Sequence, residues 1–495
     1  MKKFLSIVLS LVMVFSLSAT AFASDSNSTL SIPTPEEIEN YYQEIVSSQA
    51  TTRTAANTEI TSILSENSDI ANQPLLQLGV LSSFAEENND LTIISSAAEL
   101  VYKDLIPALT AEDYLTILTN ENYTNAFKFS IIDIYDYAAA SSTARNTKNF
   151  SLVDKELKSF IVPNNELAII ALSSMQDKSV IDSNQLTDIL AKGDLAEQKV
   201  ALRTLSEEYP AVSISHIKDI LSTEKEESPL YTAAINFIPR LLNNSDVLTE
   251  DEALNIIDTI LANTNNYLVQ ITCVQALLEL NSAAATKVLA NHTSSVPVEL
   301  VDYYNNKSEF TITNANATSI TPRSTSNRLG HAIYRDGVAV IEYHAGLVAH
   351  SQGPEYDDTG DWVIHASGAS GSIVEYATFD EFMKTSNNTY IGEYYMDGMS
   401  LTDHYNIFFT AVDLTNESIG YTLWSIFTTD LTSGTIEPSD INKMRCDGVV
   451  EYSYEYNNIK VLGGSTNWDV STVSGLNAHS GTPKSQSKAF DSKYE

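Results

Sequence analysis

Cysteine is scarce in this chain, since Cys273 and Cys446 are the only two in 495 residues. Exported proteins that are held together by disulfides carry a larger, even-numbered set, so the count argues against a disulfide scaffold. Cys273 stands four residues from both Val269 and Leu277, and we expect it to be a small buried residue on the apolar face of a helix. A bridge between Cys273 and Cys446 is the alternative.

Basic residues are also few. The chain has 28 lysines and arginines against 64 aspartates and glutamates, which gives a formal net charge of −36. A field of this sign repels phosphate backbones and anionic lipid surfaces, so we expect no nucleic-acid partner. A solvated acidic surface explains most of the charge, and the charge therefore identifies no substrate.

Long apolar runs are missing except at the N-terminus. Lys2 and Lys3 precede an apolar run over residues 4–17, and Ala21 and Ala23 follow it, which is the pattern of a secretory signal peptide over residues 1–23. The run is too short for a lasting membrane span, which needs roughly 20 apolar residues. We therefore expect cleavage after Ala23, no integral membrane segment, and a secreted, extracellular protein that could associate with the cell wall.

Residues 24–305 have few glycines and read as a domain of helices. Thr34 followed by Pro35, and Thr249 followed by Glu252, are typical helix starts. Apolar helical segments recur roughly every 35 residues, each with a second amphipathic stretch beside it. They begin at residues 164 ("NNELAIIALSSM"), 196 ("AEQKVALRTL"), 230 ("LYTAAINFIPRLL") and 267 ("YLVQITCVQALLEL"). This period predicts an α-solenoid, with an irregular helical bundle as the alternative, and such a domain could hold a protein partner.

Residues 306–328 are rich in Asn, Ser and Thr and are predicted to be a linker. The period then changes to that of strands, with a tight hairpin turn expected at Asp336-Gly337. Further strands are expected at "DWVIHAS", "SIVEYA", "YIGEYYM" and "YNIFFTAVDL", and a short helix capped by Thr378 at "TFDEFMKT". The predicted fold class is multidomain, an α domain followed by an α+β domain over residues 329–495.

The chemistry-bearing residues gather in this last domain. Six of the eight histidines lie after residue 330, and Cys446 stands where a helix is expected to begin. A thiol at a helix N-terminus feels the unpaired N–H groups and the positive end of the dipole, so we expect a lowered pKa, with Arg445 assisting and Asp447 opposing. A buried filler is the plainer interpretation of a lone cysteine.

Two histidines on predicted strands complete a candidate site. If both imidazoles point into one cleft, His344 can take the thiol proton while His365 fixes its orientation and tautomer. Each histidine taken alone is more often a structural residue.

"YHAGLVA", "WVIHASG" and, much later, "MRCDGVVEYSYE" resemble the circularly permuted branch of the NlpC-type, papain-like cysteine hydrolases. This branch includes the lecithin:retinol acyltransferase-like and YiiX-like proteins. The resemblance covers about residues 329–470 and implies a papain-like α+β domain with an antiparallel sheet. It also implies Cys446 as nucleophile, His344 as general base and His365 as the polar third member. The helical half resembles degenerate HEAT or armadillo repeats.

The chain departs from the pattern of that branch in two places. The segment between the two histidines, "AHSQGPEYDDTGD", is longer and more acidic than the usual hairpin, so His350 competes with His365 for the third position. Gly448 and Val449 replace the Ser-Glu that is common after the cysteine, which leaves the subfamily open.

The resemblance implies a thiol hydrolase, a cysteine peptidase or amidohydrolase acting by acyl transfer, without metal or cofactor. Export favours amide bonds of peptidoglycan stem peptides as the substrate, with lipid esters or amides as an alternative. A non-catalytic binding or scaffold protein with a degenerate hydrolase domain is a further alternative. A zinc hydrolase would use His344, His350 and His365 as ligands, and a serine hydrolase is disfavoured because "GASGS" lacks the G-x-S-x-G spacing.

Overall fold

The structure is a computed structural model of the chain. It describes residues 30–48, 73–140, 150–243, 247–312, 328–338, 342–349, 362–369, 371–384, 388–431, 433–462, 466, 468–470 and 482–494. The predicted signal peptide, most of the predicted linker, His350 and His479 therefore lie outside the described residues. Residues 33–495 form one compact unit.

The first part of this unit consists of helices, as the sequence predicts. The α-helices are α2 (Pro35–Ser48), α4 (Pro74–Asn88), α5 (Thr92–Ala108), α6 (Ala111–Leu118), α7 (Asn125–Ala140), α9 (Ser151–Phe160), α10 (Ala168–Ser174), α11 (Ser183–Lys192), α12 (Leu195–Glu208), α13 (Pro210–Thr223), α14 (Pro229–Asn236), α15 (Glu250–Asn263), α16 (Tyr267–Leu280), α17 (Ala283–Asn291) and α18 (Val298–Lys307). Short 3₁₀ helices η1 (Lys178–Val180) and η2 (Pro239–Asn243) connect some of them.

Both predicted helix starts are confirmed. The Glu37 backbone N–H donates to Thr34 Oγ1 at 3.2 Å, and Pro35 is the first residue of α2. At α15, Thr249 and Glu252 form the reciprocal hydrogen bonds of a capping box. These bonds satisfy N–H groups that a helix start leaves without partners.

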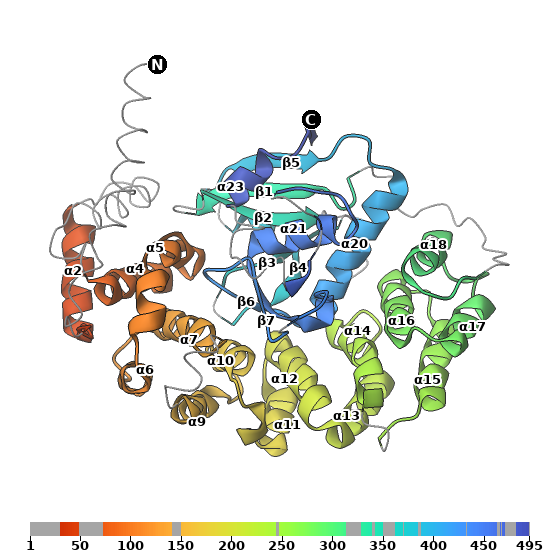
Figure 1. Cartoon of the computed structure of the whole chain (residues 1–495), viewed down its shortest axis with the longest axis horizontal. Coiled ribbons are helices and arrows are strands. Elements are labelled where there is room, and N and C mark those ends of the chain that lie inside the picture. Colours follow the sequence, from red (N-terminus) through yellow and green to blue (C-terminus); the bar gives the residue numbers. More distant parts are fainter. Residues whose placement is uncertain are drawn as a thin grey trace. The chain divides into compact units, whose positions relative to one another are not determined.

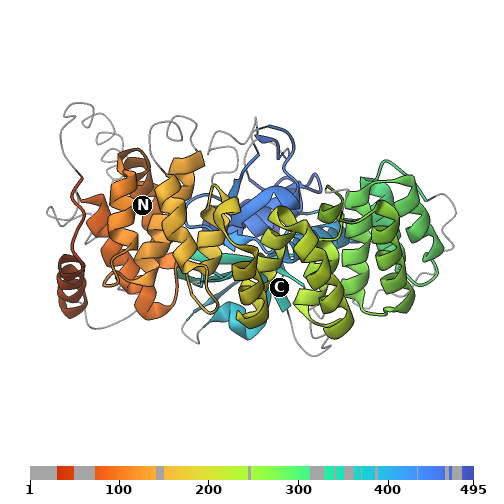
Figure 2. The same cartoon turned by 90° about the horizontal axis from the view of Figure 1, so that it is seen from below.

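Consecutive helices pack against one another in chain order, which Figure 2 shows as a row from orange to green. α11 contacts α12, α12 contacts α13, and α13 contacts α14. Farther along, α16 packs against α14, α15, α17 and α18. The resemblance to HEAT or armadillo repeats stays a prediction, and Cys273 on α16 is fully buried, as expected.

The second part combines strands and helices. Its elements are β1 (Ala332–Val338), β2 (Glu342–Val348), β3 (Trp362–Ala366), β4 (Val374–Thr378), α19 (Phe379–Met383), β5 (Tyr390–Tyr395), α20 (Leu401–Asn416), β6 (Gly420–Tyr421), β7 (Phe427–Thr429), η3 (Pro438–Asp440), β8 (Ile441–Met444), α21 (Cys446–Glu455), α23 (Pro483–Ser487) and β9 (Ser492–Tyr494). A helical part followed by an α+β part is thus confirmed, while the papain-like fold itself belongs to the proposals below.

Within the described residues, six strands form one antiparallel sheet in the order β4-β3-β2-β1-β5-β9. A smaller sheet has the order β6-β8-β7, in which β6 runs parallel to β8. α20 packs against β2, β3 and β4 of the large sheet (Figure 1), whereas β6 and β8 of the smaller sheet contact α10 of the helical part. The large sheet carries the two candidate histidines, on β2 and β3.

The predicted turn at Asp336-Gly337 is wrong. β1 continues through both residues to Val338, which pairs with Glu342, so the chain reverses between these two positions. The backbone N–H of Asp336 donates to the Thr389 carbonyl at 3.0 Å, and the Asp336 carboxylate accepts from the Thr389 N–H. These bonds to Thr389, the residue before β5, hold Asp336 in the strand and override the turn preference of the dipeptide.

The strand predicted at "YNIFFTAVDL" is also wrong, because this segment is the centre of helix α20. Ser400 caps the helix through a capping box with Asp403. The buried aromatic positions Tyr405, Phe408 and Phe409 follow a helical spacing. The predicted short helix at Thr378 is confirmed as α19, with Thr378 in a capping box.

The two faces of the large sheet are covered by different helices. Phe382 of α19 forms a buried cluster with Ile333, Val348 and Val363 on one face. Tyr334, whose side chain points the opposite way from its neighbours on β1, donates from its hydroxyl to Gln486 of α23 at 3.0 Å. Gln486 in turn donates to the Asp447 carbonyl at 2.9 Å. α21 and α23 therefore lie over the face opposite α19.

Buried polar contacts join the helical part to the α+β part. Arg203 of α12 donates to the backbone carbonyls of Glu417, Ser439 and Ile441 at 2.9–3.0 Å. Lys443 of β8 forms ion pairs with Asp133 and Asp136 of α7. These contacts supply partners for buried charges on both sides of the junction.

Candidate active site

Cys446 is the first residue of α21, as the sequence predicts. Arg445 occupies the N-cap with an extended backbone, and its N–H donates to the Ile426 carbonyl at 3.0 Å. The Arg445 side chain forms two hydrogen bonds with the Asp447 carboxylate, at 2.6 and 2.7 Å. The thiol of Cys446 is free and 0% exposed. Cys273 is also a free cysteine, so the alternative of a bridge between them is wrong.

The structure brings His344 and His365 together on adjacent strands. His344 Nε2 and His365 Nδ1 share a hydrogen bond of 2.7 Å. The Phe382 ring centroid lies 5.4 Å from each imidazole centroid, which places both rings on the α19 face of the sheet. Both histidines are buried. The predicted pairing of the two imidazoles is confirmed, and their catalytic roles stay a prediction.

The Cys446 thiol reaches strand β2 at the residue next to His344. It forms a hydrogen bond with the Ala345 backbone, and this bond lowers the pKa of the thiol. A bond that favours the thiolate is one in which the backbone N–H donates. The sulfur therefore lies on the α21 face of β2, at Ala345, whereas the His344 side chain points to the opposite, α19 face of the sheet.

The thiol and the His344 imidazole are not hydrogen-bonded to each other. Nε2 of His344 is engaged by His365, and Nδ1 has no hydrogen-bond partner among the described residues although it is fully buried. A buried ring nitrogen without a partner is costly and is a feature that active sites retain. Nδ1 is thus the free position at which His344 could receive a proton.

Burial sets the protonation states of these groups. It is the largest cause that raises the pKa of Cys446, to about 12, and Asp447 adds to it. Arg445 and Arg335 act in the opposite direction with smaller effect. The expectation of a lowered thiol pKa at this helix start is therefore wrong in this conformation, since desolvation of the thiolate outweighs the helix N-terminus.

The two imidazoles are neutral for the same reason. Burial lowers the pKa of His344 well below its ordinary value, and the Arg335 cation lowers it further. Burial also lowers the pKa of His365, to about 3. The structure therefore holds a neutral thiol on one face of the sheet and two neutral imidazoles on the other, rather than a thiolate and an imidazolium.

Arg335 belongs to this site and was missed by the sequence analysis. It pairs directly with His344 across β1 and β2 and is 0% exposed. Its Nη1 donates to the Asp336 carbonyl at 3.0 Å and its Nε to the Phe382 carbonyl, while Nη2 has no partner among the described residues. Arg335 shares the alternation of His331 and Ile333, and a charged residue at an inward strand position was the available signal.

Two other histidines of the last domain have structural partners. His331 Nδ1 lies 2.7 Å from a carboxylate oxygen of Glu393, and its ring stacks on Tyr395. His404 Nδ1 lies 2.9 Å from the Leu329 carbonyl. Neither is hydrogen-bonded to the Cys446, His344 and His365 group, and His350, the predicted competitor of His365, lies outside the described residues.

Groups of three His, Cys, Asp or Glu side chains placed to hold a metal ion do not occur among the described residues. The zinc alternative with His350 is not tested by them. The described helices also include none that combines the length and the apolar character needed to cross a bilayer. No family model matches the chain, and no curated protein or solved structure is significantly similar to it.

Proposed function

We propose that this protein is a cysteine hydrolase of papain-like type that cleaves amide bonds by acyl transfer, with Cys446 as nucleophile, His344 as general base and His365 as orienting residue. The observation that carries the proposal is the state of His344. Its Nε2 is held by His365 at 2.7 Å, and its buried Nδ1 has no partner among the described residues. Ala345, the next residue of β2, binds the thiol on the opposite face of the sheet, so the proposed proton transfer requires the thiol to move to His344.

The first half of the reaction forms a thioester. When the His344 Nε2–H donates to His365 Nδ1, His344 Nδ1 carries a lone pair and takes the proton of the Cys446 thiol. The sulfur attacks the substrate carbonyl carbon, and N–H groups of the first turn of α21 face the developing oxyanion. The C–N bond then breaks, and the departing amine receives the proton from His344.

The second half releases the acid. A water molecule gives one proton to His344 Nδ1 and attacks the thioester carbonyl carbon. The C–S bond breaks, and the proton on His344 returns to the Cys446 sulfur. The amide plus one water yields an amine plus a carboxylic acid, and no electron donor or acceptor is required.

The resting geometry supports a closed enzyme. The thiol is 0% exposed, and its pKa is raised to about 12. A substrate carbonyl can reach the sulfur only after a rearrangement, and the same rearrangement must bring the thiol from the α21 face of the sheet to the His344 imidazole on the α19 face. The same two observations favour the second candidate, a binding protein in which the hydrolase site is inert.

Export predicted from the N-terminus favours cell-wall peptides as the substrate class, and localisation outside the cell is part of the proposal. Lipid esters or amides are the alternative within the same chemistry. The decisive assay incubates the purified protein with sacculi and with a phospholipid dispersion, and follows new stem-peptide fragments or released fatty acids by mass spectrometry.

Cys446→Ala and Cys273→Ser form the matched pair for this assay, because both cysteines are free and buried. The proposal expects turnover that Cys446→Ala abolishes and Cys273→Ser leaves intact. Fragments that persist in Cys446→Ala would overturn the nucleophile. If neither substrate is cleaved, even after treatments that expose Cys446 to iodoacetamide, the inert binding protein is the correct assignment.

A further inference from the structure

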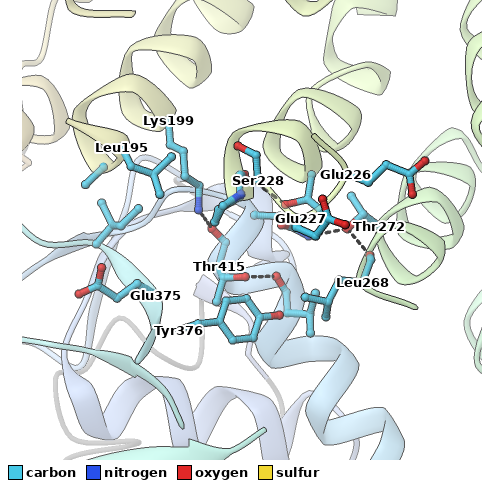
Figure 3. Close-up of a pocket in the computed structure, with 16 residues that line it drawn as sticks. Leu195, Lys199, Glu226, Glu227, Ser228, Leu268, Thr272, Glu375, Tyr376 and Thr415 are labelled. Carbon is cyan, nitrogen blue, oxygen red and sulfur yellow. Dashed lines mark hydrogen bonds between the residues drawn. The ribbon is translucent and has the colours of Figure 1, made fainter. Parts of the chain in front are cut away.

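A cavity of about 160 Å³ lies between the helical part and the edge of the large sheet. Figure 3 shows residues from α12, α14, α16, α20 and β4 around it. None of the candidate catalytic residues lines this cavity, so it is a separate site. Engineered cavities of similar size, about 150 Å³, bind molecules as large as benzene.

A buried cation lies at one end of the cavity. Lys199 of α12 is 3% exposed, and its Nζ donates to the Thr415 carbonyl at 2.6 Å. Among the described residues, no carboxylate forms an ion pair with it. An ammonium group has three donors, so Lys199 retains donors for a ligand in the cavity. Burial of a charge without an ion pair is costly, and burial lowers the pKa of Lys199 to about 8.

Acidic side chains line the other end. Glu226 and Glu227 lie in the loop between α13 and α14, where Glu227 is exposed and Glu226 is half-buried. Thr264 Oγ1 donates to one carboxylate oxygen of Glu226 at 2.6 Å. Figure 3 shows Glu227 on the opposite side of the cavity from Lys199, while the Glu226 side chain extends away from Lys199. The exposed glutamate places the mouth of the cavity at this loop.

Apolar side chains form the walls between the two ends. Leu268, Ile373 and Val412 are buried and line the cavity. Leu195 is 44% exposed and lies at the same cavity, an unusual exposure for a leucine at the start of a helix. The walls of the cavity therefore suit a small aliphatic group of the ligand, and its charged groups belong at the two ends.

We propose that this cavity binds a free α-amino acid with an aliphatic side chain. Its carboxylate accepts hydrogen bonds from Lys199, its ammonium group faces Glu227, and its side chain packs against Leu268 and Val412. The proposal does not depend on the proposed hydrolase activity.

The charges select this class over simpler ligands. A monocarboxylate would satisfy Lys199 but would meet the carboxylates of Glu226, Glu227 and Glu375, which all line the cavity. A monoamine would leave the remaining donors of Lys199 without an acceptor, since the Glu375 and Glu417 carboxylates act on Lys199 without a hydrogen bond to it. A ligand with both groups complements the two ends.

The test is isothermal titration calorimetry of the full chain with L-leucine, D-leucine, 4-methylpentanoate and 3-methylbutylamine. The first two carry both charges, and each of the others lacks one. We expect one leucine enantiomer or both to bind one per chain, with each single-charge analogue about 10- to 100-fold weaker, the range of one charged hydrogen bond. Binding of 4-methylpentanoate as tight as that of leucine would overturn the zwitterion assignment.

Two variants and one control locate the binding. Lys199→Met should weaken leucine binding about 10- to 100-fold, whereas Lys192→Met, at an exposed lysine of α11 paired with Asp188, should leave it unchanged. Ala196→Leu fills the cavity from α12 while Lys199 stays in place, and should abolish binding. Unchanged binding in either cavity variant, or no leucine binding by the folded wild type, would refute the site.

Discussion

Lys443 and Asp133 form a fully buried ion pair across 310 positions of the sequence, with Nζ 2.9 Å from Oδ1 and neither side chain exposed. Asp136 lies 2.7 Å from the same ammonium group. We expect Lys443→Met to lower the free energy of unfolding by about 3–5 kcal/mol, because two buried carboxylates lose their cation. Urea unfolding followed by circular dichroism measures this.

The control for this substitution is Lys192→Met. Lys192 and Asp188 form an exposed pair on one helix, and such pairs contribute less than about 0.5 kcal/mol. Equal losses from Lys443→Met and Lys192→Met would contradict a stabilising role for the buried pair.

The folded protein should protect Cys446 from alkylation. A thiol pKa of about 12 leaves a thiolate fraction at pH 7.5 that is about 1000-fold or more below that of free cysteine, and the thiol is also 0% exposed. Labelling with iodoacetamide and peptide mapping by mass spectrometry gives the rate, with the urea-unfolded chain as reference. A native rate equal to the unfolded one would show that the site is open.

Arg335 should increase the loss of folding stability that His344 causes at acid pH. The folded pKa of His344 is lowered by burial and then by Arg335, so the unfolded chain binds the proton more tightly. This contribution to stability is present above the ordinary histidine pKa near 6.5 and is lost as the pH falls below it. Arg335→Met should raise the pKa of His344 and reduce this loss.

Histidine ring signals in NMR titrations of wild type and Arg335→Met report the change in pKa. A His344 signal that titrates identically in both proteins would exclude the cation as a cause.

Glu451 on α21 should make a contribution to stability whose pH dependence is opposite to that of His344. Burial raises the pKa of Glu451, and the nearby Glu455 carboxylate raises it further. Since the folded state then binds the proton more tightly, this stabilisation is present below pH 4.5 and is lost as the pH rises above it. Glu451→Gln should reduce the fall in unfolding free energy between pH 5 and 8 by on the order of 1–3 kcal/mol. Parallel stability curves for the two proteins would refute this.

Gly448 is required by the packing of α21. A Cβ at this position would lie 2.3 Å from the Ile426 carbonyl oxygen and 2.7 Å from Met444 Cγ. Gly448→Ala and Gly448→Ser should therefore destabilise by about 1–3 kcal/mol, although alanine favours helices. Ser453→Ala on the same helix removes a buried hydroxyl without a hydrogen-bond partner among the described residues, and should be close to neutral. Thermal unfolding compares the three; a tolerated Gly448→Ser would contradict the steric argument.

Local hydrogen-bonding patterns were the predictable part of the fold. Thr34, Thr249 and Thr378 cap helices as expected, because a cap is formed within four residues. The Asp336-Gly337 turn failed because Thr389, more than fifty residues later and just before β5, forms hydrogen bonds with Asp336. The strand predicted over the segment that begins at Tyr405 is a helix. The prediction failed because it followed the aromatic content of the segment, which favours strands, and not the helical spacing of its apolar residues.

The candidate site divides in the same way. Motif order indicated that His344 and His365 would meet, and they do. The protonation state of Cys446 depends on what covers the sulfur, which no local pattern encodes. Lys199 was missed because its cavity is formed by segments up to 221 positions apart in the sequence. The sequence of its own helix gives no sign that this lysine is buried.

Arg203, which reaches three carbonyls of the α+β part, has a consequence for work with shorter gene fragments. A fragment that codes only for residues 329–495 translates the whole motif set of the hydrolase but leaves the carbonyls of Glu417, Ser439 and Ile441 without their guanidinium donor. The fragment also lacks Asp133 and Asp136, which pair with the Lys443 ammonium group in the intact chain. Insoluble product from such a fragment would therefore say nothing against catalysis by the intact chain.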